Sequence, residues 1–212
     1  MNISPDRLEE RLKRPLPGIE AQRLMSPISA TAYYEVPQNA VEAGVMMILY
    51  PCDRDVYTTL IRRASNNPLD KHAGQLSFPG GRYEQGDGNM LTCALREAEE
   101  EIGIKRQDVK VLGNLSPLYI FASNFYIHPF VGWMSQRPQF QAQPEEVDEI
   151  LEVPLRKLFD KNGKLCRNIL TRGHILKDVP CYDVNGHYLW GATAMVVSEF
   201  EWILKDMLIE KV

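Results

Sequence analysis

The stretch GRYEQGDGNMLTCALREAEEEIGI, residues 81–104, joins a glycine-rich turn to an unusually acidic helix. The pattern predicts a helix over residues 89–102, with Asn89 as its N-cap and Gly103 as its C-terminal stop. At helical spacing its apolar residues form one stripe that faces a core: Leu91, Ala94, Leu95, Ala98 and Ile102. The carboxylates of the helix therefore lie beside this stripe, at the border between the core and the surface.

Three of these carboxylates gather in the last turns of the helix. Glu97 and Glu101 are four residues apart and share a face, and Glu100 is three residues from Glu97. The helix dipole disfavours negative charge at this end, and within the predicted helix no lysine or arginine stands four residues from either Glu97 or Glu101. We expect Arg96 to point away from their edge. A solvated acidic face is the ordinary interpretation, but these features favour a site for a divalent cation such as Mg²⁺, completed by the phosphates of a substrate.

A glycine pair precedes the helix. The strand-like run GQLSF, residues 74–78, stops at Pro79-Gly80-Gly81. Successive glycines permit positive φ and the close approach of a backbone or a ligand. A tight connection would explain the pair equally well when it is taken alone. Its fixed distance from the carboxylates favours a hinge at the edge of the metal site.

Residues 81–104 resemble the Nudix box. The second half of that motif, Arg-Glu-aliphatic-x-Glu-Glu-x-Gly-aliphatic, is matched without a gap by residues 96–104. The first half departs from the usual pattern, because its acidic residue is Asp87 and one residue more than usual separates it from Arg96. That variant resembles the coenzyme A pyrophosphatase (CoA diphosphatase) subfamily. The upstream segments LIRRAS, residues 60–65, and DKHAGQLSFPGGRYEQGD, residues 70–87, resemble the same subfamily.

The resemblance implies an α/β (α+β) fold, the Nudix α/β/α sandwich with a mixed β-sheet between helices. It implies metal-dependent hydrolysis of a diphosphate bond, which in coenzyme A would release 3',5'-ADP and 4'-phosphopantetheine. It also implies that Glu97 and Glu101 ligate Mg²⁺ or Mn²⁺, with Glu100 either a further ligand or the group that orients the attacking water. Arg96 is expected to pair with Asp87 or with a box glutamate and so hold the loop. The resemblance does not identify the general base.

Basic residues around the glycine pair are candidates for contacts with the substrate, because guanidinium forks suit phosphate oxygens. The predicted substrate-binding residues are Arg62, Lys71, His72, Gly80, Gly81 and Arg82, and Arg63 is a further candidate. For Lys71 and His72 the alternative is an exposed loop pair. Glu146 is a secondary candidate for a base or a metal contact, and a solvated loop carboxylate is its favoured alternative. Ser77 and Cys93 lack a His/Asp constellation, which disfavours nucleophilic catalysis.

Two alternatives to a coenzyme A diphosphatase stay open. One is a Nudix pyrophosphatase that acts on another nucleoside diphosphate derivative, such as ADP-ribose or a dinucleotide. The other is a non-catalytic Nudix domain that senses a nucleotide. Such a sensor is expected to lose carboxylates of the box, whereas Glu97, Glu100 and Glu101 are all present.

The rest of the chain reads as one mixed α/β domain behind an N-terminal segment. We expect residues 1–40 to form a helix, at 4–13, and an extended arm, and residues 41–212 to form the Nudix hydrolase domain. Strands are predicted at 44–50, 56–64, 74–78, 109–120, 126–134 and 145–153, a short helix at 154–159, a hairpin that turns at Asn185-Gly186, and a last helix at about 191–208. The proline-containing arm is a candidate for contacts in a homodimer.

Composition narrows the partners. The chain has 212 residues, 44% hydrophobic and 25% charged, with a net charge of -4, which argues against broad binding of nucleic acid. We find no apolar run long enough to span a membrane and no secretory signal. Four scattered cysteines without a CxxC pair fit reduced thiols. We therefore expect a cytoplasmic enzyme with a small-molecule substrate and no membrane or nucleic-acid partner.

Overall fold

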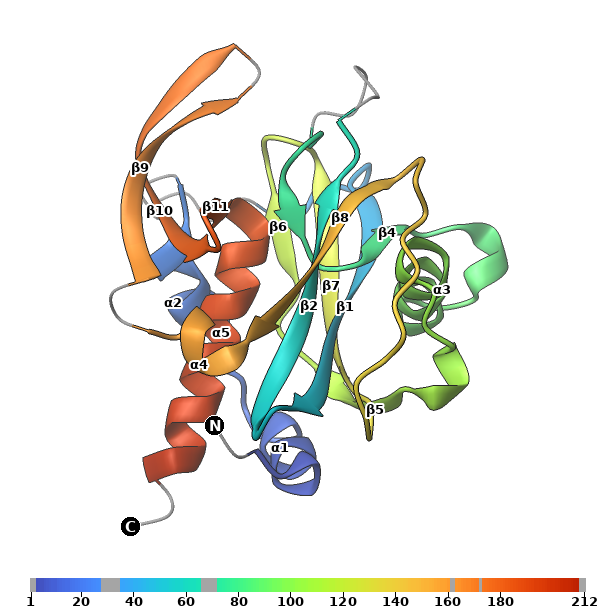
Figure 1. Ribbon diagram of the computed structural model, residues 1–212. Coiled ribbons are helices and arrows are strands. Elements are labelled where there is room, and N and C mark those ends of the chain that lie inside the picture. Colours follow the sequence, from blue (N-terminus) through green and yellow to red (C-terminus); the bar gives the residue numbers. More distant parts are fainter. Residues whose placement is uncertain (1–2, 28–34, 66–71, 161–162, 172, 210–212) are drawn as a thin grey trace.

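The central sheet is built around β1 (Val41–Cys52) in the computed structural model, which describes residues 3–27, 35–65, 72–160, 163–171 and 173–209 (Figure 1). One end of β1 pairs antiparallel with β2 (Asp55–Arg63), and its other end pairs antiparallel with β4 (Gly80–Arg82). Along its second edge β1 runs parallel to β7 (Phe125–Trp133). The sheet is therefore mixed, as predicted.

The remaining strands extend this sheet on both sides. β3 (Leu76–Ser77) and β8 (Val147–Pro154) pair with β2, and β5 (Lys110–Asn114) and β6 (Leu118–Ile120) pair with β7, all antiparallel. The sequence predicts one strand over 109–120, which is wrong because the chain divides there into β5 and β6. Pro117, between them, has no N–H to donate to a ladder, and the register of β5 shifts between Val111 and Gly113.

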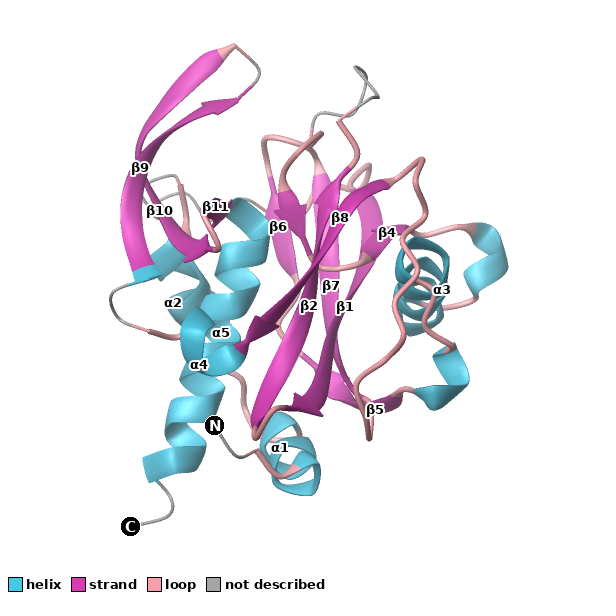
Figure 2. Cartoon of the chain, viewed as in Figure 1, coloured by secondary structure: helices cyan, strands magenta, loops and turns pink. Residues whose placement is uncertain are grey.

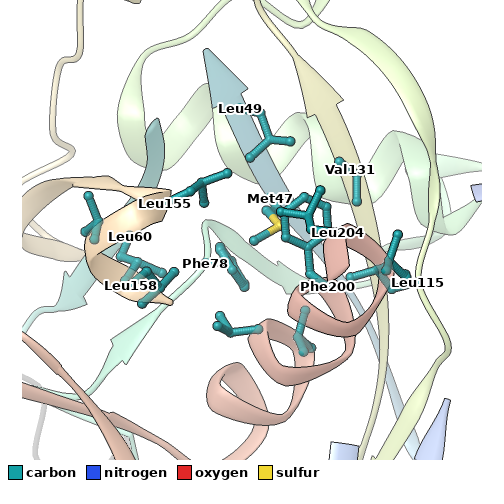
Figure 3. Packing of buried hydrophobic residues seen from close by; sticks show 14 of the residues in the cluster. Met47, Leu49, Leu60, Phe78, Leu115, Val131, Leu155, Leu158, Phe200 and Leu204 are labelled. Carbon is teal, nitrogen blue, oxygen red and sulfur yellow. The ribbon is translucent and has the colours of Figure 1, made fainter. Parts of the chain in front are cut away.

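Helices cover both faces of the sheet. Figure 2 shows α3 (Met90–Ile102) on one side, and α5 (Gly191–Ile209) with α1 (Pro5–Leu12) toward the other. Side chains of β1 alternate between the two layers: Met46, Ile48 and Tyr50 pack toward α3, whereas Met47 and Leu49 pack toward α5. Figure 3 shows Met47 and Leu49 near Phe200 and Leu204 of α5. The predicted sandwich of a sheet between helices is confirmed.

Short elements complete the chain. They are α2 (Ile19–Gln22), the 3₁₀ turns η1 (Arg23–Met25), η2 (Gln85–Asp87) and η3 (Arg106–Asp108), α4 (Leu155–Leu158), and a second sheet of β9 (Lys164–Thr171), β10 (His174–Val184) and β11 (His187–Trp190). β10 and β11 form the hairpin predicted at Asn185-Gly186. Among the described helices, none combines the length and the apolar character that crossing a bilayer requires.

The N-terminal segment packs on the domain. The predicted first helix is confirmed as α1, with Ser4 as N-cap and Pro5 in its first turn. An extended arm is wrong for residues 19–25, which are helical. Leu8, Leu12 and Met25 are buried in the same apolar cluster as α5, because their side chains fill the outer side of that layer. Residues 28–34 of the predicted arm lie outside the described residues.

Pro79, Gly80 and Gly81 join two strands of one sheet. β3 pairs with β2, and two residues later β4 pairs with β1. The Pro79 carbonyl accepts a hydrogen bond from Met46 N–H at 2.8 Å, which holds the crossing against β1. The segment is thus a fixed crossing between two strands of the sheet, whereas the alternative interpretation was a tight connection between a strand and a loop.

Candidate active site

α3 delivers its carboxylates to the edge of β4. Asn89 caps the helix by accepting the N–H of Thr92 at 2.9 Å, and Gly103 ends it in the left-handed conformation with φ 72°. Ala94, Ala98 and Ile102 are fully buried against the sheet. This packing fixes the rotation of the helix and thereby the direction of Glu97 and Glu101.

Glu101 is a buried carboxylate with 1% of its side chain exposed. One of its oxygens accepts the Gly80 N–H at 2.8 Å, and Arg63 lies 3.7 Å from the other oxygen. Burial nevertheless raises the pKa of the carboxyl to about 8. A buried acid held so far from its ordinary pKa marks a place where an added cation would stabilise the charged form.

Glu97 lies directly beside Gly81. A Cβ atom added at Gly81 would come within 2.4 Å of the Glu97 carboxyl carbon, so the backbone and the carboxylate are in contact. Arg96 Nη1 lies 2.8 Å from Glu97 Oε1, so the expectation that Arg96 points away from this edge is wrong. The long guanidinium curls back across the helix, because Asp87 draws it toward the loop that precedes α3. Burial raises the pKa of Glu97, although Arg96 opposes that effect.

Glu146 joins the two helix carboxylates. Single oxygen atoms of Glu97, Glu101 and Glu146 all lie within 4.8 Å of one another. Two backbone hydrogen bonds bring Glu146 there: its carbonyl accepts from Ala64 N–H at 2.8 Å, and Gln143 N–H donates to Glu101 C=O at 3.0 Å. The sequence ranked Glu146 below the box glutamates, because nothing local connects residue 146 with the helix.

Glu100 has different surroundings. Its side chain is 57% exposed and lies 3.0 Å from Arg96 Nη1, and it is not among the three clustered carboxylates. Its predicted role as a ligand or as the residue that orients water stays a prediction.

Glu97, Glu101 and Glu146 together fit a hard divalent cation. All three offer carboxylate oxygens, the donors that Mg²⁺ and Mn²⁺ prefer over nitrogen or sulfur. Two of the three carboxyl groups are buried enough to have raised pKa values, and the third is exposed and open to a substrate. Burial and the neighbouring carboxylates both oppose ionisation of Glu97 and Glu101, and a bound cation relieves both effects.

Comparison with known proteins agrees with this geometry. The "NUDIX domain" family matches residues 41–171. The chain is 35% identical over 141 residues to the "Uncharacterized Nudix hydrolase NudL" of Photorhabdus laumondii, covering 66% of this chain and 74% of that protein. A protein of the same name from Yersinia pestis is 34% identical over 154 residues, covering 73% of this chain and 75% of that protein.

The chain belongs to the Nudix family.

Solved structures support the same fold. "Crystal structure of a Nudix Hydrolase from M. Smegmatis, RenU" superposes with a TM-score of 0.55 at 12% identity, over 79% of this chain and 87% of that one. "Crystal structure of MutT/nudix family protein from Enterococcus faecalis" gives a TM-score of 0.51 at 14% identity, over 97% and 76%. Nudix hydrolases act on pyrophosphate bonds and generally use divalent metal ions, and this chain is a hydrolase of that family.

In this Nudix hydrolase Arg96 clamps the loop that leads into the helix. Its Nε and Nη2 lie 2.7 and 3.0 Å from the two oxygens of Asp87, and Nη2 also donates to the Arg82 carbonyl at 3.1 Å. Asp87 in turn accepts the N–H of Glu84 at 2.8 Å. The geometry agrees with the expected pairing of Arg96 with Asp87. These contacts lower the pKa of Asp87 to about 2, chiefly through the hydrogen bonds from Arg96.

Replacing Asp87 with Asn should destabilise this Nudix hydrolase in a pH-dependent way. A carboxyl with pKa about 2 when folded and 3.8 ordinarily contributes stability above pH 4, and that contribution is lost as the pH falls through 2. We expect Asp87→Asn to lower the free energy of unfolding by about 2 kcal/mol at pH 7 and by roughly half as much at pH 3. Urea denaturation at both pH values measures the difference.

The control for this experiment is Asp108→Asn, on an exposed carboxylate in η3. It should change the free energy of unfolding by less than about 0.5 kcal/mol. An equal loss for Asp87→Asn at pH 7 and pH 3 would show that the Asp87 charge is not what Arg96 stabilises.

The predicted substrate-binding residues occupy two places around the carboxylates. His72 and Arg82 both lie against Phe125, at 6.5 Å between ring centroids and 5.4 Å from the Arg82 guanidinium carbon to the ring centroid. Arg62 instead pairs with Asp148 at 3.3 Å and with Glu149 at 3.2 Å. Lys71 lies outside the described residues. The sequence did not indicate Phe125 as a neighbour of these two residues, since a single aromatic residue beside a predicted strand is usually interpreted as part of the core.

Nucleophilic catalysis by the cysteine of the box has no support in the geometry. Cys93 is fully buried, and burial raises the pKa of its thiol to about 11. A thiol in that state is a poor nucleophile at neutral pH.

Proposed function

We propose that this Nudix hydrolase is a metal-dependent coenzyme A diphosphatase, which releases 3',5'-ADP and 4'-phosphopantetheine. The observation that carries the proposal is the position of the two segments that resemble the coenzyme A subfamily, residues 60–65 and 70–87. Their residues form one wall of the carboxylate cluster: Gly80 N–H binds Glu101, Arg63 lies 3.7 Å from Glu101, and Gly81 contacts Glu97. The segments that resemble the subfamily therefore also contact the proposed metal ligands Glu97 and Glu101.

The proposed mechanism assigns Glu97, Glu101 and Glu146 to hold Mg²⁺ or Mn²⁺. When bound, such a cation offsets the negative charge of the diphosphate and makes a water more acidic. Gly80 N–H fixes the orientation of the Glu101 carboxylate, and Arg96 does the same for Glu97. Glu146, the exposed member of the trio, is the one open to accept the proton of the attacking water. In this proposal Glu100 contributes through its ion pair with Arg96.

The nucleotide half of the substrate is assigned to the surface around Phe125, which Arg82 and His72 contact. Arg82 and His72 flank Phe125, which gives a cationic and aromatic patch suited to phosphate and to an adenine ring. The 3'-phosphate of coenzyme A requires such a cation, and Arg82 is the candidate nearest to the carboxylates along the chain.

Two alternatives are tested by the same assay. A Nudix pyrophosphatase on ADP-ribose or a dinucleotide would need the same carboxylates but no site for pantetheine. A non-catalytic sensor is disfavoured, because three carboxylates converge within 4.8 Å.

Incubation with Mg²⁺ or Mn²⁺ and a panel of coenzyme A, ADP-ribose and diadenosine polyphosphates should give the highest kcat/KM for coenzyme A. Chromatography of the products should show 3',5'-ADP and 4'-phosphopantetheine in equal amounts. A Glu101→Gln preparation purified in parallel controls for contaminating hydrolases. Turnover of ADP-ribose without turnover of coenzyme A would overturn the proposed substrate.

Two further predictions accompany this proposal. The cytoplasm, where thiols stay reduced, suits the four cysteines, all of which are free. Homodimer contacts through the N-terminal segment stay a prediction. Sedimentation of the purified protein would measure whether it is a dimer.

A further inference from the structure

A groove runs along β8, on the side of the sheet that faces α3. It has a volume of about 480 Å³ and is lined by residues of β8 and of the segment before it, including Arg137, Phe140, Asp148, Ile150 and Glu152. Neither the proposed metal ligands nor the predicted substrate contacts use its apolar wall, Phe140 and Ile150. Both of these side chains are half-buried and pack against the cluster beneath α3.

The groove begins beside the carboxylate cluster. Glu146 directly precedes β8, so the strand that forms one wall leads away from the proposed metal ligands. The opposite wall is tied to the end of α3, because Gln141 N–H and Gln143 N–H donate to the carbonyls of Ile102 and Glu101 at 3.0 Å each. Figure 1 shows this segment running between α3 and β8. A molecule held at the metal could therefore extend directly into the groove.

The charged groups of the groove are paired with one another. Arg137 donates to both oxygens of Glu152, at 2.7 and 2.5 Å, and Tyr50 donates to the same carboxylate at 2.8 Å. At the other end Arg62 engages Asp148 and Glu149. Three carboxylates share two arginines, so the groove has a small excess of negative charge and favours a neutral occupant over a second phosphate.

β8 also offers backbone hydrogen bonds. Among the described strands it pairs with β2 alone, so alternate N–H and C=O groups on its other edge point away from the sheet. Extended chains that contain amides add to such an edge as an extra strand does. A neutral chain with amide groups would match the charge of the groove and could also pair with the open edge of β8 beside it.

We infer that this groove binds the pantetheine arm of the substrate, an inference that rests on the proposed function. The arm is neutral and has two amides, and the methylene carbons toward its thiol end suit the apolar wall of Phe140 and Ile150. Its backbone is as long as about four residues of extended peptide, roughly 14 Å. The first part of β8, from Val147 to Ile150, spans roughly 13 Å at the usual rise of a strand. The thiol end would then lie at Ile150, before the Arg137–Glu152 pair.

Ile150→Trp tests the inference by filling the groove without adding charge. We expect the KM for coenzyme A to rise at least tenfold, with kcat changed less than threefold. Inhibition by the product 4'-phosphopantetheine should weaken at least tenfold, while inhibition by 3',5'-ADP stays within twofold. Leu170→Trp is the matched control, an aliphatic residue on the β9–β10 hairpin whose side chain is exposed. It should leave all four quantities within twofold.

Circular dichroism and the melting temperature show whether Ile150→Trp is folded. If it is not, Phe140→Ala replaces it, and we expect the KM for coenzyme A to rise and inhibition by 4'-phosphopantetheine to weaken by about threefold each. Wild-type turnover of coenzyme A with unchanged inhibition by 4'-phosphopantetheine in the folded variant would overturn the groove assignment alone. An equal loss of inhibition by both products would overturn it as well, by showing a general defect. Absence of turnover of coenzyme A by the wild type would overturn the proposed function and this inference together.

Discussion

Glu101→Gln should lower kcat by at least about two to three orders of magnitude at saturating Mg²⁺, and Glu97→Gln should do the same. Each change removes one proposed anionic ligand from a trio whose oxygens lie within 4.8 Å of one another. A neutral amide keeps the shape of the side chain but binds a hard cation far more weakly. In the Glu101→Gln variant the amide carbonyl can still accept the Gly80 N–H, so the fold should persist.

The measurement is steady-state kinetics over a range of metal concentrations, with circular dichroism as the check on folding. Glu99→Gln is the matched control, because Glu99 belongs to the same helix but pairs with Arg106 away from the trio. It should retain kcat within about threefold. Near-normal kcat at saturating metal in either Glu97→Gln or Glu101→Gln would remove that residue from the proposed ligand set.

Gly81→Ala should abolish most of the activity through a single methyl group. The new Cβ would come within 2.4 to 2.5 Å of the Glu97 carboxyl atoms, so the carboxylate has to move out of the trio. Retreat of the whole helix would separate Ala94, Ala98 and Ile102 from the sheet against which they are buried, so we expect the Glu97 side chain to move instead. We expect kcat/KM to fall by about two orders of magnitude and the concentration of Mg²⁺ at half-maximal activity to rise.

Gly86→Ala provides the control for that variant, since a Cβ at Gly86 would meet nothing within 4 Å. It should keep activity within about twofold and the melting temperature within a few degrees. If Gly81→Ala retained wild-type activity and metal dependence, the position of Glu97 against the β4 backbone would not matter for catalysis.

Local signals in the sequence predicted the elements well. Asn89 and Gly103 specify the two ends of α3 through their side-chain and backbone preferences, and Asn185-Gly186 specifies a hairpin in the same way. β5 and β6 were merged because their separation depends on pairing with β7, which lies further along the chain. The same limit applies to residues 19–25, whose helical turns are packed against α5.

The sequence predicted the part of the candidate site that lies within α3 and the loop before it. It predicted less well the part that comes from elsewhere in the chain. Glu97 and Glu101 could be placed together from helical spacing, and the pairing of Arg96 with Asp87 follows from the motif. Glu146 was only a secondary candidate, since its approach depends on backbone hydrogen bonds from Ala64 and between Gln143 and Glu101. The direction of Arg96 was wrong because a flexible guanidinium follows its acidic neighbours more than the helix face that carries it.

The hydrogen bonds that bring Glu146 to α3 also have a consequence for folding. Glu97 and Glu101 lie together as soon as α3 is folded. Glu146 joins them only when the chain before β8 has packed on the end of α3. A cation that requires all three therefore binds the completed structure in preference to any partly folded one. Added metal should then stabilise the folded state. The apparent melting temperature should rise in proportion to the logarithm of the metal concentration.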